Sequence, residues 1–180
     1  MLNAVIVGTG DYLYEALTAW QQLPAGVNLI ETPGVAVGAR DRVYALTRNP
    51  AHPVIVFEPD GTFVASFGQG VFSERTHGIL AGPDGSIYCA DDGTHTITKF
   101  TPDGQLLMTL GQRNQPTPRW SGQPFNRPTH VAVSSASGNL YVSERKLTDS
   151  QVHRGRPVCQ FVGRARHRSR PVHSPSQHCC

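Results

Sequence analysis

Two histidines, His77 and His130, are the side chains whose setting in this sequence points most directly to chemistry. Each follows a threonine and opens a short apolar run, Gly78–Ala81 in the first case and Val131–Val133 in the second. Two imidazoles that open equivalent strands would face a common axis, and imidazole is a frequent ligand of zinc and other transition metals. The alternative is that each ring bonds backbone or water at the start of its strand. Both interpretations stay open.

The elements that would position these histidines repeat along the chain. The Pro-Asp-Gly triplet recurs at 59–61, 83–85 and 102–104, and tyrosines in β-type runs recur at Tyr44, Tyr88 and Tyr141, 44 and 53 residues apart. The longer second interval fits an insertion in the Pro- and Gly-rich stretch 113–124. Each period holds four short β-type runs joined by glycine-containing turns, which supply the positive φ of a tight hairpin. Four strands in about 40 to 45 residues are typical of a β-propeller blade.

The repeats predict an all-β fold, a partial β-propeller with about three blades. The blade-like units lie near 33–70, 76–111 and 128–154, and the third strand of the last unit is expected at Gln151–His153. Ahead of them, Leu2–Val7 and Leu13–Trp20 are apolar, and we favour a leader strand there over an amphipathic helix. A propeller needs at least four blades to close. We therefore expect exposed blade edges that self-associate, or a longer protein of which this chain is a part.

Charge and composition separate the tail, residues 155–180, from the rest of the chain. Residues 1–144 hold 8 Lys/Arg and 12 Asp/Glu, whereas residues 145–180 hold 8 and 1. The tail has too few apolar side chains to offset its ordering entropy, which predicts disorder. No apolar run is long enough for a membrane span, and a basic signal segment is missing near Met1. With three of the 4 cysteines in the tail, no disulfide framework is indicated, and we expect a cytoplasmic protein.

Blocks of the sequence resemble the NHL-repeat family of six-bladed propellers, in particular bacterial proteins similar to peptidyl-α-hydroxyglycine α-amidating lyases. The blocks that carry the resemblance are Gly10–Glu15, Arg42–Arg48, His52–Phe57, Thr76–Ile79, Ser86–Asp92 and Thr96–Gly111. The match runs from about Gly8 to Ser143. The resemblance implies a closed propeller with a zinc ion on its axis, held by histidines of the inner strands.

The resemblance also implies roles for particular residues. His77 aligns with the first zinc ligand, and Arg48 aligns with a catalytic arginine that handles a small-molecule or peptide substrate on the axis. The implied reaction is the collapse of a carbinolamide to an amide and glyoxylate, with the metal acidifying the hydroxyl. A tyrosine expected after Ser143 is missing, because the chain continues Glu144-Arg145. Asp91 and Asp92 fit turn bonding better than metal binding.

With one aligned ligand of the three that a catalytic zinc usually takes, the chain as given is expected to be inactive. The alternative function is a non-catalytic propeller that binds a protein or small molecule on its rim.

The tail also bears on the resemblance. When each codon from Val162 onward is read from its second base, the shifted codons are compatible with Trp-Gly-Glu-Pro-Gly-Thr and with the rest of the segment that comes next in the family. We therefore predict that residues 155–180 are an out-of-frame translation. The alternative is a nucleic-acid arm, since Arg164, Arg166, Arg168 and Arg170 alternate and could neutralise phosphates. The tail holds a single aromatic residue, Phe161, for base stacking. The shifted frame explains the same arginines, so we expect no nucleic-acid partner.

Overall fold

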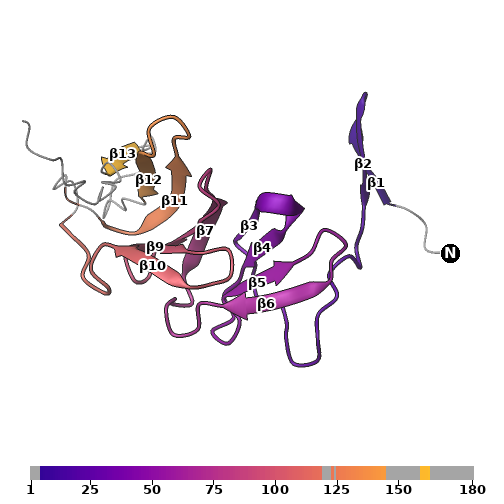
Figure 1. The fold of residues 1–180 in the computed structure, drawn as a ribbon, viewed down its shortest axis with the longest axis horizontal. Helices are drawn as coiled ribbons and strands as arrows, with labels where there is room; N and C mark the ends of the chain where they lie inside the picture. The colour runs from indigo at the N-terminus through magenta and orange to yellow at the C-terminus, as the bar shows by residue number, and fades with distance from the viewer. Residues whose placement is uncertain (1–4, 119–122, 124, 145–158, 163–180) are drawn as a thin grey trace, which may run out of the picture.

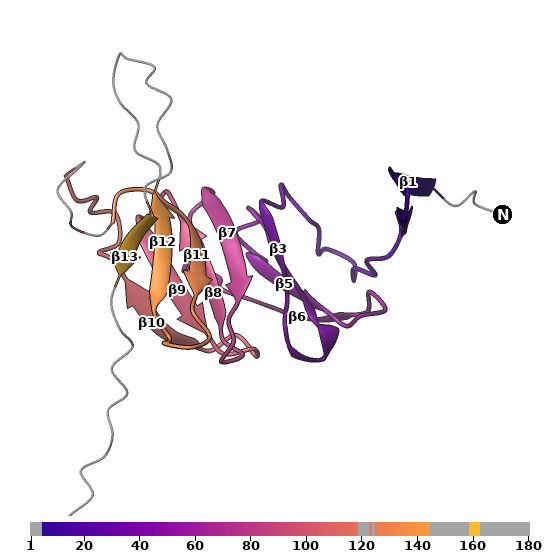
Figure 2. The same ribbon diagram turned by 90° about the horizontal axis from the view of Figure 1, so that it is seen from above.

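The computed structural model describes residues 5–118, 123, 125–144 and 159–162, and these form an all-β partial propeller (Figures 1 and 2). The first sheet contains β3 (Gly34–Val37), β4 (Val43–Leu46), β5 (Val54–Phe57) and β6 (Phe63–Phe67). The second contains β7 (Thr76–Ala81), β8 (Ile87–Asp91), β9 (Thr96–Phe100) and β10 (Leu106–Leu110). Both are four-stranded antiparallel meanders in chain order, and the all-β fold class predicted from the repeats is confirmed.

The third sheet contains β11 (Pro128–Val133), β12 (Leu140–Glu144) and β13 (Cys159–Val162), again in antiparallel order. The third strand expected at Gln151–His153 lies outside the described residues. Instead, the backbone of β13 pairs with β12, with Cys159 opposite Ser143 and Val162 opposite Leu140. The out-of-frame origin of residues 155–180 stays a prediction.

A β-hairpin precedes the three sheets and lies away from them in Figure 1. It consists of β1 (Val5–Thr9) and β2 (Tyr12–Ala16), paired through the tight turn that Gly10 allows with its φ of 60°. The chain is thus extended where we favoured a strand over a helix. Nearly all of its apolar side chains are exposed, including Tyr12 and Leu13. Among the described residues, no helix is long and apolar enough to cross a membrane.

Of the three hydrophobic clusters in the described residues, two lie between successive sheets, and the third packs the first sheet against the segment before β3. The cluster between the first and second sheets contains Tyr44, Phe67 and Phe100, and the cluster between the second and third contains Tyr88 and Val142. Tyr44 and Tyr88 are the core residues that the repeat predicted. Tyr141, their counterpart in the third unit, is 41% exposed, so this part of the prediction is wrong. The reason is that no fourth sheet is described against its face.

The inner strands β3, β7 and β11 contact one another in succession, and they form the edge of the three sheets that faces the propeller axis (Figure 2). Glycines make this approach possible. A Cβ at Gly34 would lie 3.1 Å from Ile79 Cγ2, and a Cβ at Gly78 would lie 2.5 Å from the carbonyl oxygen of Thr129. The rim where these strands begin is therefore built from closely packed backbones, and the candidate residues lie on it.

Candidate functional site

A cleft of about 230 Å³ opens at the rim where the inner strands begin. Its lining comes from two units: the first supplies Arg48, from the loop that follows β4, and the second supplies Glu74, Arg75, His77 and Asp92. In an antiparallel meander the start of an inner strand and the end of the second strand lie at the same edge. This is why the β4–β5 loop, the start of β7 and the end of β8 meet there.

Arg48 is held at this rim by the segment that precedes β3. Its guanidinium forms an ion pair with Glu31, and its backbone N–H donates to the carbonyl oxygen of Ile30 at 2.9 Å. The Nε atom of Arg48 is buried and has no hydrogen-bond partner among the described residues. A second hollow of about 280 Å³, lined by Ile30, Glu31, Arg48, Pro50 and Glu74, adjoins the cleft. Arg48 and Glu74 line both.

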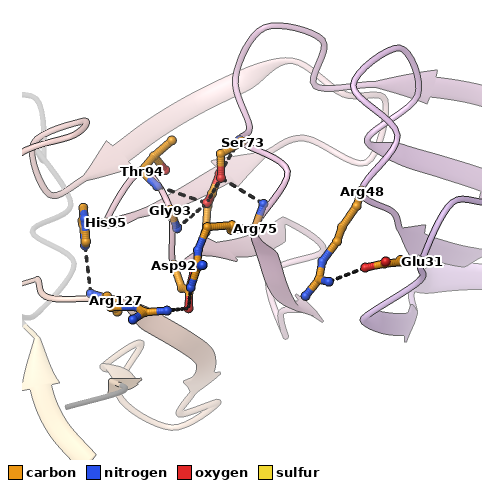
Figure 3. A network of polar contacts seen from close by, with 10 residues as sticks. Glu31, Arg48, Ser73, Arg75, Asp92, Gly93, Thr94, His95 and Arg127 are labelled. Carbon is orange, nitrogen blue, oxygen red and sulfur yellow. Dashed lines mark hydrogen bonds and ion pairs between the residues drawn. The ribbon is translucent and has the colours of Figure 1, made fainter. Parts of the chain in front are cut away.

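Asp92 binds two arginines from separate parts of the chain (Figure 3). Its Oδ1 accepts a hydrogen bond from Arg75 Nε at 2.6 Å, and its Oδ2 accepts from Arg75 Nη2 and Arg127 Nη2, both at 3.0 Å. The Asp92 side chain is 3% exposed, whereas that of Arg75 is 53% exposed. The carboxylate therefore ties the loop before β7 to the loop before β11, and these strands carry the two candidate histidines.

His95 supports Arg127 through the backbone. The Nδ1 atom of His95 accepts the Arg127 N–H at 3.1 Å, so the ring proton must lie on Nε2 when the imidazole is neutral. Burial lowers the pKa of His95 and outweighs the opposing charges of Asp92 and Asp91. His95 and Arg127 have φ values of 62° and 58°. Such left-handed conformations are uncommon outside glycine and persist where surrounding contacts fix them.

Asp91 has a structural role. Its buried carboxylate accepts hydrogen bonds from the backbone and hydroxyl of Ser73, both at 2.6 Å, and from the backbone N–H groups of Gly93 at 2.8 Å and Thr94 at 3.1 Å. The turn bonding predicted from the sequence is confirmed for Asp91. For Asp92 it is not the main interaction, because that carboxylate binds Arg75 and Arg127 instead.

His77 is exposed and lies at a β-bulge in β7. Thr76 pairs with Asp91 and Gly78 pairs with Ala90, so His77 is the extra residue between two successive pairs of the ladder. A bulge changes the direction of a side chain and is common beside active sites. The bulge therefore accounts for the presence of His77 in the lining of the cleft.

His130 does not occupy the equivalent position, contrary to our expectation. Tyr88 pairs with Leu80 in the second unit, and Tyr141 pairs with Ala132 in the third. Two residues before Leu80 is Gly78, and two residues before Ala132 is His130, so Gly78 and His130 are ladder counterparts: they occupy the same position in their strands. By the same count, the counterpart of His77 is Thr129.

Turn length is the physical reason for this offset. The connection between the paired ends of β7 and β8 spans residues 82–86, whereas the one between β11 and β12 spans 134–139 and is one residue longer. The equal spacing of each histidine from its tyrosine therefore conceals a shift of one residue in register, and such a shift exchanges the faces of a strand.

The structure brings Arg48 and His77 into one cleft, but His130 is not part of its lining. A Cβ at Gly78 would lie 2.5 Å from His130 Nδ1, so that ring packs against β7. In the described part of the chain, no group of three His, Cys, Asp or Glu side chains is placed to hold a metal ion. Since a catalytic zinc usually takes three protein ligands, these residues alone do not fit such a centre. The metal-binding roles of His77 and His130 stay predictions.

Taken together, the sheets and the cleft define a segment of a β-propeller that carries a charged site at the axial rim. No family model matches the chain. Peptidyl-alpha-hydroxyglycine alpha-amidating lyase 1 of Drosophila melanogaster is 32% identical to it over an alignment of 95 positions, which covers 51% of this chain and 17% of the fly protein. The chain thus spans about a sixth of the length of this curated relative.

Two solved structures support the fold alone. The virginiamycin B lyase from Staphylococcus aureus superposes with a TM-score of 0.50 and 15% identity, over 73% of this chain and 38% of the lyase. A protein of unknown function from Bacteroides thetaiotaomicron also gives 0.50, with 19% identity, over 64% of this chain and 30% of that protein.

Proposed function

We propose that this chain is part of a propeller enzyme of the amidating-lyase kind, and that the cleft between the first two units is its substrate site. The observation that carries the proposal is the meeting of Arg48 and His77 in one cleft, although they come from different units. These are the two positions to which the family resemblance gives roles in catalysis. The identity of 32% with a lyase over half of the chain supports the same conclusion.

The residues of the cleft suit a substrate with a carboxylate. A guanidinium has five N–H donors, and the pairing of Arg48 with Glu31 uses a donor on Nη1 alone. The donors left on Nη1 and Nη2 can bind the carboxylate of a peptidyl-α-hydroxyglycine and orient it beside His77, and charge-assisted bonds of this kind are the strong ones. Zinc, when bound, would acidify the substrate hydroxyl. His77 is our candidate for one of its ligands, and the others would come from outside the described residues.

The test uses a protein in which the predicted frame is restored and translation continues to the next stop codon. We expect release of glyoxylate from a peptidyl-α-hydroxyglycine and bound zinc in the purified protein. The Arg48→Ala variant should lose about 10²-fold in kcat/KM, as is common when one charged donor is removed from a reacting site. Arg40→Ala is the matched control, because Arg40 is exposed at the other end of β4.

A metal-free protein that releases no glyoxylate would overturn the proposal and favour the binding scaffold. The proposal has three further parts that rest on the sequence: a six-bladed NHL-type propeller, a cytoplasmic location and no nucleic-acid partner.

A further inference from the structure

Within the part of the chain that the structure describes, the charged side chains of the cleft are paired with one exception. Arg48 binds Glu31, and Arg75 binds Asp92, which also binds Arg127. Glu74 lines both the cleft and the adjoining hollow, and its carboxylate makes no hydrogen bond or ion pair with the described residues. An exposed carboxylate in a cleft, with no internal partner, can interact with a ligand without first breaking a contact.

The backbone on both sides of Glu74 is fixed. On one side, Ser73 gives both its N–H and its hydroxyl to the buried carboxylate of Asp91. On the other, the Arg75 N–H donates to Ser73 Oγ at 3.1 Å, while the Arg75 side chain is anchored on Asp92. Glu74 is therefore a free side chain on a fixed backbone, between two anchored neighbours. Catalytic side chains need such support to keep their geometry.

The neighbours of Glu74 also indicate what it would bind. Arg48 and Arg75 carry positive charge on the cleft wall, and both are held by other carboxylates. An anionic ligand can thus place its carboxylate against Arg48 while a hydroxyl or N–H donor of the same ligand points to Glu74. A peptidyl-α-hydroxyglycine has this combination, since its α-carbon carries a carboxylate, a hydroxyl and an amide nitrogen.

We propose that Glu74 is the proton acceptor for the α-hydroxyl in this cleft, an inference that rests on the proposed function. The carboxylate takes the hydroxyl proton, the O–H electrons form the C=O bond of glyoxylate, and the Cα–N bond breaks. The electrons of that bond pass to nitrogen, which takes back the proton from the Glu74 carboxyl. The products are the peptide amide and glyoxylate, and the base is regenerated. Glu74 supplies a base in a chain that lacks the tyrosine expected after Ser143.

The experiment measures glyoxylate release by the frame-restored protein and its Glu74→Gln variant. Gln keeps the size of the side chain and removes the base, so kcat should fall by about 10²- to 10⁴-fold, the usual contribution of a general base. KM should stay within about threefold, because Arg48 still binds the carboxylate. Glu74→Asp keeps a carboxylate and should retain part of the rate. This second variant keeps the proposal testable if the Gln variant fails to fold.

Glu15→Gln is the matched control, because Glu15 lies on the exposed hairpin strand β2, away from the cleft. Its kcat should equal that of the parent protein. If the parent releases glyoxylate and Glu74→Gln keeps its kcat, or changes KM alone, the role of Glu74 is overturned while the proposed function stands. If the parent releases no glyoxylate, the proposed function fails, and the role of Glu74 fails with it.

Discussion

Replacing Asp92 with Asn should destabilise the second and third units. The substitution keeps the shape of the side chain but leaves two guanidinium groups without their shared carboxylate. Arg127, with 21% side-chain exposure, loses a hydrogen bond to a charged partner, which typically contributes about 1.5–3 kcal/mol. Arg75 is 53% exposed, so solvent screening reduces its share to roughly 0.2–1 kcal/mol. Together these terms give a loss of about 2–4 kcal/mol.

Urea unfolding of the 180-residue chain, followed by far-UV circular dichroism, measures this loss. Small domains have m-values of about 1–3 kcal/mol/M in urea, and at an m-value of about 2 kcal/mol/M the midpoint should fall by about 1–2 M. The control is Glu58→Gln at the other rim, where Glu58 pairs with Arg42 and both groups reach solvent. Its midpoint should move less. Equal shifts for the two variants would refute the view that Asp92 joins the two units.

Three further outcomes follow from the structure. Gly78→Ala should lower the free energy of unfolding by about 1–3 kcal/mol and should give a lower thermal midpoint than Gly34→Ala. The added Cβ at position 78 meets the Thr129 backbone, whereas the nearest atom to a Cβ at position 34 belongs to a side chain. Burial lowers the pKa of His95 below its ordinary 6.5. The contribution of His95 to stability should therefore be complete above pH 6.5 and decline as the pH falls through the lower pKa of the folded state. Urea midpoints measured from pH 7.5 to 5 should show this decline, and His95→Asn should make them depend less on pH. Light scattering should show self-association of the chain through its exposed apolar strands, and a monodisperse monomer would contradict this.

The fold could be predicted from the sequence because its signals are local. A strand of four to six residues and a Pro-Asp-Gly turn are both set by neighbouring residues, and the glycines of these turns, Gly61, Gly85 and Gly104, all have positive φ. The prediction failed at Tyr141, since burial of that ring depends on a sheet that packs against it from elsewhere. A repeat indicates which face of each unit is apolar but not whether that face is covered.

The candidate site was predictable only in part. His77 was found from its position in the repeat and from the family resemblance, and Arg48 from the resemblance alone. The structure places them in one cleft. The ion pairs of Asp92 join residues 17 and 35 positions away, and nothing in the local sequence distinguishes them from solvent-exposed charges. Glu74 was missed because its local sequence also resembles that of an ordinary solvent-exposed charge. The shift of His130 by one residue depends on the length of one turn, which only the strand pairing shows.

The glycines on the inner strands leave room for neighbouring sheets to approach closely. Gly34 and Gly78 are ladder counterparts, and each lets the next inner strand approach to backbone contact. His130 occupies the same ladder position in the third unit. The imidazole of His130 lies over Gly78, where a Cβ would be only 2.5 Å from its Nδ1, so the space that this glycine leaves is filled from the third unit. A side chain at position 78 would therefore have to displace both this ring and the carbonyl oxygen of Thr129.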